Sequence, residues 1–227
     1  MSYKDDSFNI DFNDFSDVVI ESKRKAPICL VLDNSGSMAE RYEGTMKIDE
    51  LNNNMKRFLE FVRNNEKARR ISDLSIISFG GKVDVVSGYT SIDKIKFKPL
   101  VPTGSTPLGA AMEKAIELLD LRRNYYRENG IERYKPTILV MSDGQPTDNY
   151  LYIADKVSSM VKNKEIKIFP VGIGADFRKD ALKAFSPFLE PKLIHNSAGF
   201  SKLFELLSAS TSNPEDDQLE KWFDDEF

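Results

Sequence analysis

Three short polar segments of the sequence carry side chains that could bind a hard metal ion. In the first, DNSGSM, the side chains of Asp33, Ser35 and Ser37 are two residues apart. That spacing places all three on one side of an extended chain, and Gly36 allows the segment to turn sharply. A carboxylate and two hydroxyls are hard oxygen donors, which suit Mg²⁺ or Mn²⁺ and not Zn²⁺.

The other two segments add donors of the same kind. TGSTPL carries the hydroxyl of Thr106, and VMSDGQPTD carries the carboxylate of Asp143. Mg²⁺ requires near-octahedral oxygen coordination and usually keeps water ligands. Because most of these protein donors are neutral, a bound ion would retain much of its charge and would accept an Asp or Glu oxygen from a partner protein. The segments therefore predict a metal site that is completed by its ligand.

The elements that must position these segments alternate between strand and helix patterns. Apolar runs and alternating patterns predict strands at 27–33, 73–80, 82–89, 136–143, 166–174 and 192–196. Helical spacing predicts helices at 47–65, from Pro107 onward, at 153–161, at 178–185 and at 200–208. Gly80-Gly81 indicates a hairpin, so the strand that follows it should run antiparallel at the sheet edge.

This alternation predicts an α/β fold that is Rossmann-like and doubly wound. We expect a mostly parallel six-stranded sheet with one antiparallel edge strand and helices on both faces. Ligands of such sheets bind beyond the carboxyl ends of the strands. The polar segments follow the first strand, precede the long helix and follow the central strand, so they should meet at that edge.

The three segments together resemble a von Willebrand factor type A (VWA) domain. In the metal-ion-dependent adhesion site (MIDAS) of that family, an Asp-x-Ser-x-Ser motif corresponds to Asp33, Ser35 and Ser37, the threonine to Thr106 and the second acid to Asp143. The resemblance covers about residues 26–210. It implies a bound Mg²⁺, with the hydroxyls as direct or near-direct ligands and the acids often acting through water.

Within this family, S-T-P-L-G and S-D-G-x-P-T-D are similar to segments of bacterial VWA proteins from tellurium-resistance operons. This narrower resemblance implies a role in a cytoplasmic stress or defence system, beside kinase- or phosphatase-like partners.

The amino-acid composition limits which other classes of protein this chain could belong to. Hydrophobic residues make up 41% and charged residues 30% of the 227 residues, which is typical of a soluble globular protein. No apolar run approaches the roughly 20 residues that cross a bilayer, so we expect no membrane span. The single cysteine, Cys29, should be inert core, and the single histidine, His195, should be structural. With no secretory signal visible at the N-terminus, we expect a cytoplasmic protein.

Charge divides the chain into three parts. We predict an N-terminal acidic extension at 1–25, a VWA domain at 26–210 and an acidic C-terminal tail at 211–227. The net charge of −4 is not that of a nucleic-acid-binding protein.

The C-terminal tail is expected to be solvated, because residues 213–227 hold seven acids and one base. Trp222 and Phe223 leave an interaction segment as the alternative. Asp224, Asp225 or Glu226 could then bind the metal of the same or a neighbouring molecule, which would give autoinhibition or self-association.

Several polar residues have simpler structural interpretations. Thr106 could also cap the helix that begins at Pro107, and Asp148 is expected to cap the helix that follows it. The basic clusters Lys67–Arg70 and Arg122-Arg123 are expected to be solvated helix surface.

We predict a protein-interaction module and not an enzyme. The main enzymatic alternative is a metal-dependent phosphotransferase or phosphatase with Asp33 as its nucleophile. That chemistry usually needs a second acid nearby, and position 35 is Ser35 instead. The sequence also offers no convenient general base, no P-loop and no dinucleotide fingerprint. A metal-independent adaptor is the third function left open.

Overall fold

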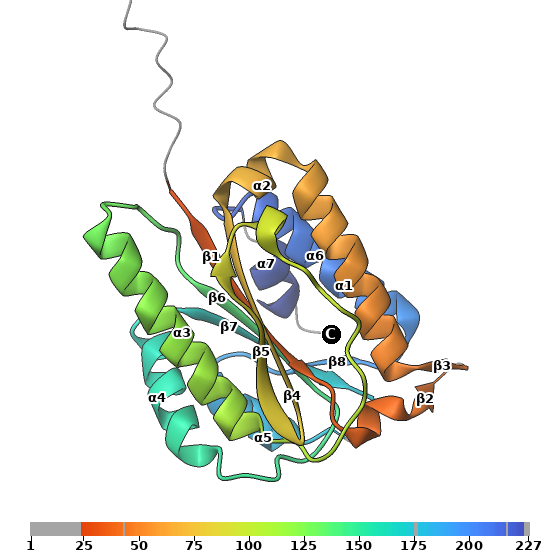
Figure 1. Cartoon of the computed structure of the whole chain (residues 1–227). Coiled ribbons are helices and arrows are strands. Elements are labelled where there is room, and N and C mark those ends of the chain that lie inside the picture. The colour runs from red at the N-terminus through yellow and green to blue at the C-terminus, as the bar shows by residue number, and fades with distance from the viewer. Residues whose placement is uncertain (1–23, 43, 175–176, 217, 225–227) are drawn as a thin grey trace, which may run out of the picture.

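The computed structural model describes residues 24–42, 44–174, 177–216 and 218–224. One six-stranded sheet runs through the molecule in the order β5-β4-β1-β6-β7-β8 (Figure 1). Strand β5 is antiparallel to β4, and the other neighbouring pairs are parallel. The predicted six-stranded sheet with one antiparallel edge strand is therefore confirmed.

The bounds of the elements agree with the predicted ranges to within a few residues, apart from the additions described below. The strands of the sheet are β1 (Ala26–Asp33), β4 (Ser72–Gly80), β5 (Lys82–Thr90), β6 (Thr137–Ser142), β7 (Lys167–Ile173) and β8 (Lys192–Ile194). The helices are α1 (Lys47–Asn64), α2 (Glu66–Ile71), α3 (Leu108–Glu128), α4 (Leu151–Lys162), α5 (Lys179–Phe185), α6 (Ser197–Ser212) and α7 (Gln218–Asp224). A small hairpin, β2 (Arg41–Tyr42) and β3 (Thr45–Met46), and two 3₁₀ turns, η2 (Gly36–Ala39) and η3 (Ile92–Lys94), complete them.

Helices cover both faces of the sheet. Helices α1, α6 and α7 pack on one face, and α3, α4 and α5 pack on the other (Figure 1). Strand β1 is buried on both sides because its side chains alternate between these layers: Leu30 points to the first and Val31 to the second. Cys29 is fully buried, and burial raises the pKa of its thiol to about 12. The expectation of an inert core cysteine agrees with this position.

Helix α7 corrects the expectation of a solvated C-terminal tail. Its apolar residues Leu219 and Phe223 lie one helical turn apart and are buried. The ring of Phe223 lies 5.0 Å from that of Phe169 in β7, and Glu220 forms a 2.6 Å ion pair with Lys167. The expectation is therefore wrong for residues 218–224, where the apolar side chains pack on the core while the acids face outward. Asp225 and Glu226 lie outside the described residues.

Arg122 also departs from the expected solvated surface. Its Nε donates to Asp73 Oδ2 at 2.5 Å, and the hydroxyl of Tyr126 donates to the same oxygen. Asp73 is buried at the start of β4, so Arg122 is the cation that balances it and ties α3 to that strand.

Among the described residues, no helix combines the length and the apolar character that a membrane span requires.

Three loops pack backbone against backbone at the carboxyl edge of the sheet. The N–H of Thr103 donates to the carbonyl of Asn34 at 2.7 Å, and the N–H of Gly36 donates to the carbonyl of Gly104 at 3.0 Å. Gly104 has φ +61°, and a Cβ there would lie 2.5 Å from Gly81 Cα. Glycine is therefore required both by the backbone conformation and by the close approach of the β4–β5 turn.

We expect Gly104→Ala to lower the free energy of unfolding by about 1–3 kcal/mol, because the methyl group forces these backbones apart. Gly130→Ala is the matched control, since Gly130 has the same φ of +61° but nothing within 4 Å of an added Cβ. Chemical denaturation of both variants measures the difference. An equal loss in both would contradict a role for the backbone contact.

Candidate metal centre

Asp33, the last residue of β1, is the innermost acid of the site. Its carboxylate is fully buried and accepts hydrogen bonds from the N–H of Ser35 at 2.7 Å and from the hydroxyl of Ser142 at 2.6 Å. Burial raises the pKa of Asp33 to about 6, although these hydrogen bonds act in the opposite direction. Ser142 ends the neighbouring strand β6, so two adjacent strand ends hold this carboxylate in place.

A chain of hydroxyls connects the first polar segment to the third. Ser35 Oγ lies 3.0 Å from Ser37 Oγ, and Ser37 Oγ donates to Asp143 Oδ1 at 2.6 Å. Ser35 and Asp143 are buried, whereas Ser37 is partly exposed. The hydroxyl of Ser37 thus lies at the opening of the cluster.

Thr106 reaches the same place from the second polar segment. A Cβ built on Gly144 would lie 3.4 Å from Thr106 Oγ1 and 3.5 Å from Ser37 Oγ, so both hydroxyls border the Cα of this glycine. Among the described residues, no hydrogen-bond partner of Thr106 Oγ1 is found, although Thr106 is only 6% exposed. A hydroxyl that has no protein partner is a suitable donor for a ligand.

Helix α3 is capped by Asp148 and not by Thr106. The carboxylate of Asp148 accepts the N–H groups of Gly109 at 3.0 Å and Ala110 at 2.8 Å. The expectation that Asp148 caps the following helix is therefore wrong, because the loop folds back onto the start of α3. Pro107 occupies the N-cap position of α3, and among the described residues no N–H of this helix is found to donate to the Thr106 hydroxyl.

Lys47 is a member of the site that sequence reasoning missed. It begins α1, and its Nζ lies 3.0 Å from Asp143 Oδ2 and 2.6 Å from Glu40 Oε2. Burial alone would lower the pKa of Lys47, but the hydrogen bonds to these two carboxylates raise it above the usual value. A lysine in the first turn of a helix usually lies in solvent, so no local signal predicts this contact.

The structure brings all five predicted residues together at the carboxyl edge of the sheet. Two carboxylates and three hydroxyls form a set of hard oxygen donors that fits Mg²⁺ or Mn²⁺. Within the described part of the chain, no group of three or more His, Cys, Asp or Glu side chains could hold a metal ion. His195 lies exposed after β8. The donor set thus fits a hard cation, and the ligand role of each residue stays a prediction.

Comparison with known proteins supports this reading of the fold. A family model described as the von Willebrand factor type A domain matches residues 28–208. Among solved structures, proximal thread matrix protein 1 (PTMP1) from the mussel byssus is 18% identical, with a TM-score of 0.60 over 84% of this chain and 47% of that chain. This chain therefore spans about half the length of the mussel protein.

Two further structures contain metal. A PTMP1 structure with a zinc-occupied MIDAS motif is 17% identical, with a TM-score of 0.55 over 83% of this chain and 48% of that chain. Manganese-loaded TRAP protein from Plasmodium vivax is 18% identical, with a TM-score of 0.50 over 74% of this chain and 64% of that chain. At these identities the likeness shows the fold alone.

Replacing Lys47 tests whether its charge balances the buried acids. We expect Lys47→Met to lower the metal-free free energy of unfolding by about 1–3 kcal/mol, because Asp143 loses its cationic partner. The same variant should bind Mg²⁺ more tightly, since a competing positive charge is removed. Denaturation and calorimetry measure the two effects. Lys56→Met, on the exposed side of the same helix, is the control. Equal free energies of unfolding in the two variants would contradict the idea that Lys47 balances the buried acids.

Proposed function

The chain belongs to the von Willebrand factor type A family, and we propose that it is a metal-dependent protein-interaction module. The observation that carries this proposal is the convergence of the Ser35, Ser37 and Thr106 hydroxyls beside two buried carboxylates. Each of these three hydroxyls comes from a loop at the carboxyl edge of the sheet, which is where α/β folds bind their ligands.

The chemistry of the donors supports Mg²⁺ or Mn²⁺ as the bound ion. Ser35, Ser37 and Thr106 would hold the ion directly, while Asp33 and Asp143 would supply negative charge from behind the hydroxyls. When bound, the ion supplies a positive charge that can bridge to a carboxylate of a partner protein. Zinc in the MIDAS of the mussel protein and manganese in the Plasmodium protein support divalent-cation binding in this fold.

The chain's own residues define how a partner would approach. Ser37 is the partly exposed member of the hydroxyl set, so an incoming carboxylate would arrive from its side. Glu40 is largely exposed beside Lys47 and would repel an acid that approached from there. Entry of an acidic side chain is thereby directed toward the hydroxyls.

The buried position of Asp33 supports a binding role over phosphoryl transfer. Both oxygens of this carboxylate accept hydrogen bonds, and the residue is fully buried. A nucleophile must reach the phosphorus atom of its substrate, so this side chain is poorly placed to attack one. We therefore keep the non-enzymatic function as part of the proposal.

The segments S-T-P-L-G and S-D-G-x-P-T-D support a more specific biological role than protein interaction in general. We propose a role in a bacterial cytoplasmic stress or defence system of the tellurium-resistance type, with a kinase- or phosphatase-like protein as partner. The single cysteine, buried and unpaired, is compatible with a reducing compartment. Self-association through Asp224, Asp225 or Glu226 stays a prediction: Asp224 ends α7, and Asp225 and Glu226 lie outside the described part of the chain.

Calorimetry with Mg²⁺ and Mn²⁺ tests the site directly. We expect the wild-type protein to bind one ion, and Ser37→Ala and Thr106→Ala to weaken binding about tenfold or more, because each removes an oxygen donor. Ser201→Ala removes an exposed hydroxyl on α6 and should leave the affinity unchanged.

A pull-down then tests the link between metal and partner. Partner retention should fall on chelation and, in Mg²⁺, in Thr106→Ala. Unchanged retention in both cases, with no detectable metal binding, would replace this proposal with a metal-independent adaptor.

A further inference from the structure

A second recognition surface lies at the opposite, amino edge of the sheet. A groove of about 560 Å³ opens between the end of α4, the start of β7 and the loop before β8. We call it the basic groove, and the residues that define it are Lys135, Lys162, Lys164, Lys167, Phe188 and Leu189. Phe188 is 63% exposed, so an aromatic ring lies in this groove together with four lysines.

Basic residues around the basic groove outnumber the acidic residues that face it. An adjoining hollow shares Lys135 and Lys164 and adds Arg123, Arg127 and Arg133. Across both hollows, seven basic residues face only three acids, which are Asp120, Glu165 and Glu220. Burial and the nearby charge of Arg123 lower the pKa of Arg133, so these cations repel one another.

Three of the groove lysines have no ion-pair partner among the described residues. They are Lys135, Lys162 and Lys164, whereas Lys167 is paired with Glu220 at 2.6 Å. An anionic ligand would relieve the repulsion and occupy these lysines. The exposed Phe188 and the neighbouring Leu189 offer apolar contact area to a ligand that carries apolar side chains as well as acids.

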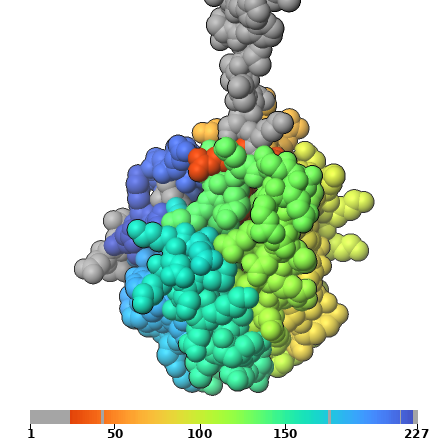
Figure 2. All heavy atoms as spheres, turned by 90° about the vertical axis from the view of Figure 1, so that its left-hand side faces the viewer, coloured from red at the N-terminus to blue at the C-terminus, as the bar shows by residue number. Residues whose placement is uncertain are grey.

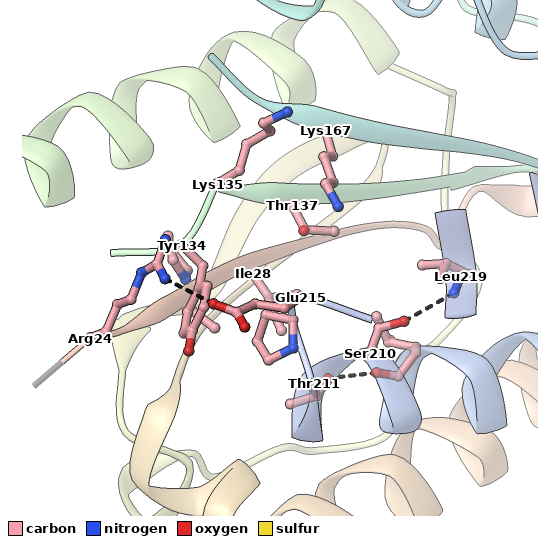
Figure 3. Close-up of a pocket in the computed structure, with 14 residues that line it drawn as sticks. Arg24, Ile28, Tyr134, Lys135, Thr137, Lys167, Ser210, Thr211, Glu215 and Leu219 are labelled. Atoms are coloured by element: carbon pink, nitrogen blue, oxygen red, sulfur yellow. Dashed lines mark hydrogen bonds and ion pairs between the residues drawn. The ribbon is translucent and has the colours of Figure 1, made fainter. Parts of the chain in front are cut away.

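The chain enters the domain beside this groove. The N–H of Lys25 donates to the carbonyl of Glu132, and the N–H of Tyr134 donates to the carbonyl of Lys25, each at 2.8 Å. Arg24 stacks 4.0 Å from the ring centre of Tyr134 and pairs with Glu215 at 3.1 Å (Figure 3). Figure 3 shows Lys135 and Lys167 beside this anchor, and Figure 2 shows the start of β1, the segment after α3 and the end of α6 meeting at this end of the molecule.

The sequence ahead of this anchor has the complementary chemistry. Residues 1–21 contain six acids and one base. Apolar side chains alternate with these acids: Phe8, Ile10, Phe12, Phe15, Val18 and Ile20. Such a segment offers carboxylates to the lysines and aromatic rings to Phe188 and Leu189.

We propose that residues 5–21 bind in the basic groove of the same molecule. Covalent attachment at Arg24 makes this contact intramolecular, so even weak contacts are favoured by an effective concentration of about millimolar order. The groove lies at the amino ends of β6 and β7, whereas the candidate metal centre lies at the carboxyl ends. The docked segment covers a basic and apolar surface that could otherwise bind acidic segments of other proteins, and its binding requires no metal.

Hydrogen exchange of the full-length protein tests this proposal. At low salt and low protein concentration, amides of residues 5–21 should exchange about threefold or more slowly than in the groove variant Lys135→Glu/Lys164→Glu. The control is Lys96→Glu/Lys98→Glu, which changes the charge equally at exposed lysines outside the groove and should keep the slow exchange. High salt should accelerate exchange in the wild type.

Variants in residues 5–21 provide a second test that does not depend on the groove variant folding correctly. Asp11→Asn/Asp14→Asn/Asp17→Asn should also abolish the slow exchange while the amides of β1 and β6 remain protected. Equal exchange in the wild type and both groups of variants would overturn the proposal. Slow exchange that disappears on dilution would mean that a second copy of the chain occupies the groove. Slow exchange that is lost only on chelation would mean that the segment binds at the metal centre. Either result would overturn the proposal.

Discussion

The charge of two buried carboxylates is the constraint on which the rest of the site depends. Asp33 is fully buried and Asp143 is only 2% exposed, and a buried carboxylate is tolerated only with hydrogen bonds and a cation nearby. Serine hydroxyls and one backbone N–H provide the hydrogen bonds, and Lys47 provides a single positive charge. Two buried acids beside one ammonium leave negative charge that a divalent ion could balance, and in the proposed site the three hydroxyls would be its direct donors.

The fold creates this constraint through the ends of its parallel strands. Strands β1 and β6 end side by side, so Asp33 and Ser142 meet although they are far apart in the sequence. Glycine backbones in the surrounding loops pack directly on one another, which fixes the position of Thr106 beside the other donors. The amino ends of the same strands form a surface of opposite character, rich in cations. One sheet thus presents the candidate metal centre at one edge and a basic groove at the other.

Much of this architecture could be predicted, because its signals are local. Apolar runs and alternating patterns predicted the six strands, and polar segments after two strands and before the long helix predicted the five donors. Contacts set by tertiary structure could not be predicted: Lys47 reaches Asp143 across the sheet edge, and Asp148 caps α3 only because its loop folds back. Helix α7 was missed because seven acids obscure the two apolar residues that anchor it. In each case the partner lies far away in the sequence, so no local pattern predicts the contact.

Crystals grown with saturating Mn²⁺ would test the central claim most directly, because manganese can be located by its anomalous scattering. The account predicts one strong peak within about 2.5 Å of the hydroxyl oxygens of Ser35, Ser37 and Thr106, with solvent or a neighbouring carboxylate at the open position. An ion bound elsewhere, or no peak while these three hydroxyls turn away from one another, would contradict it.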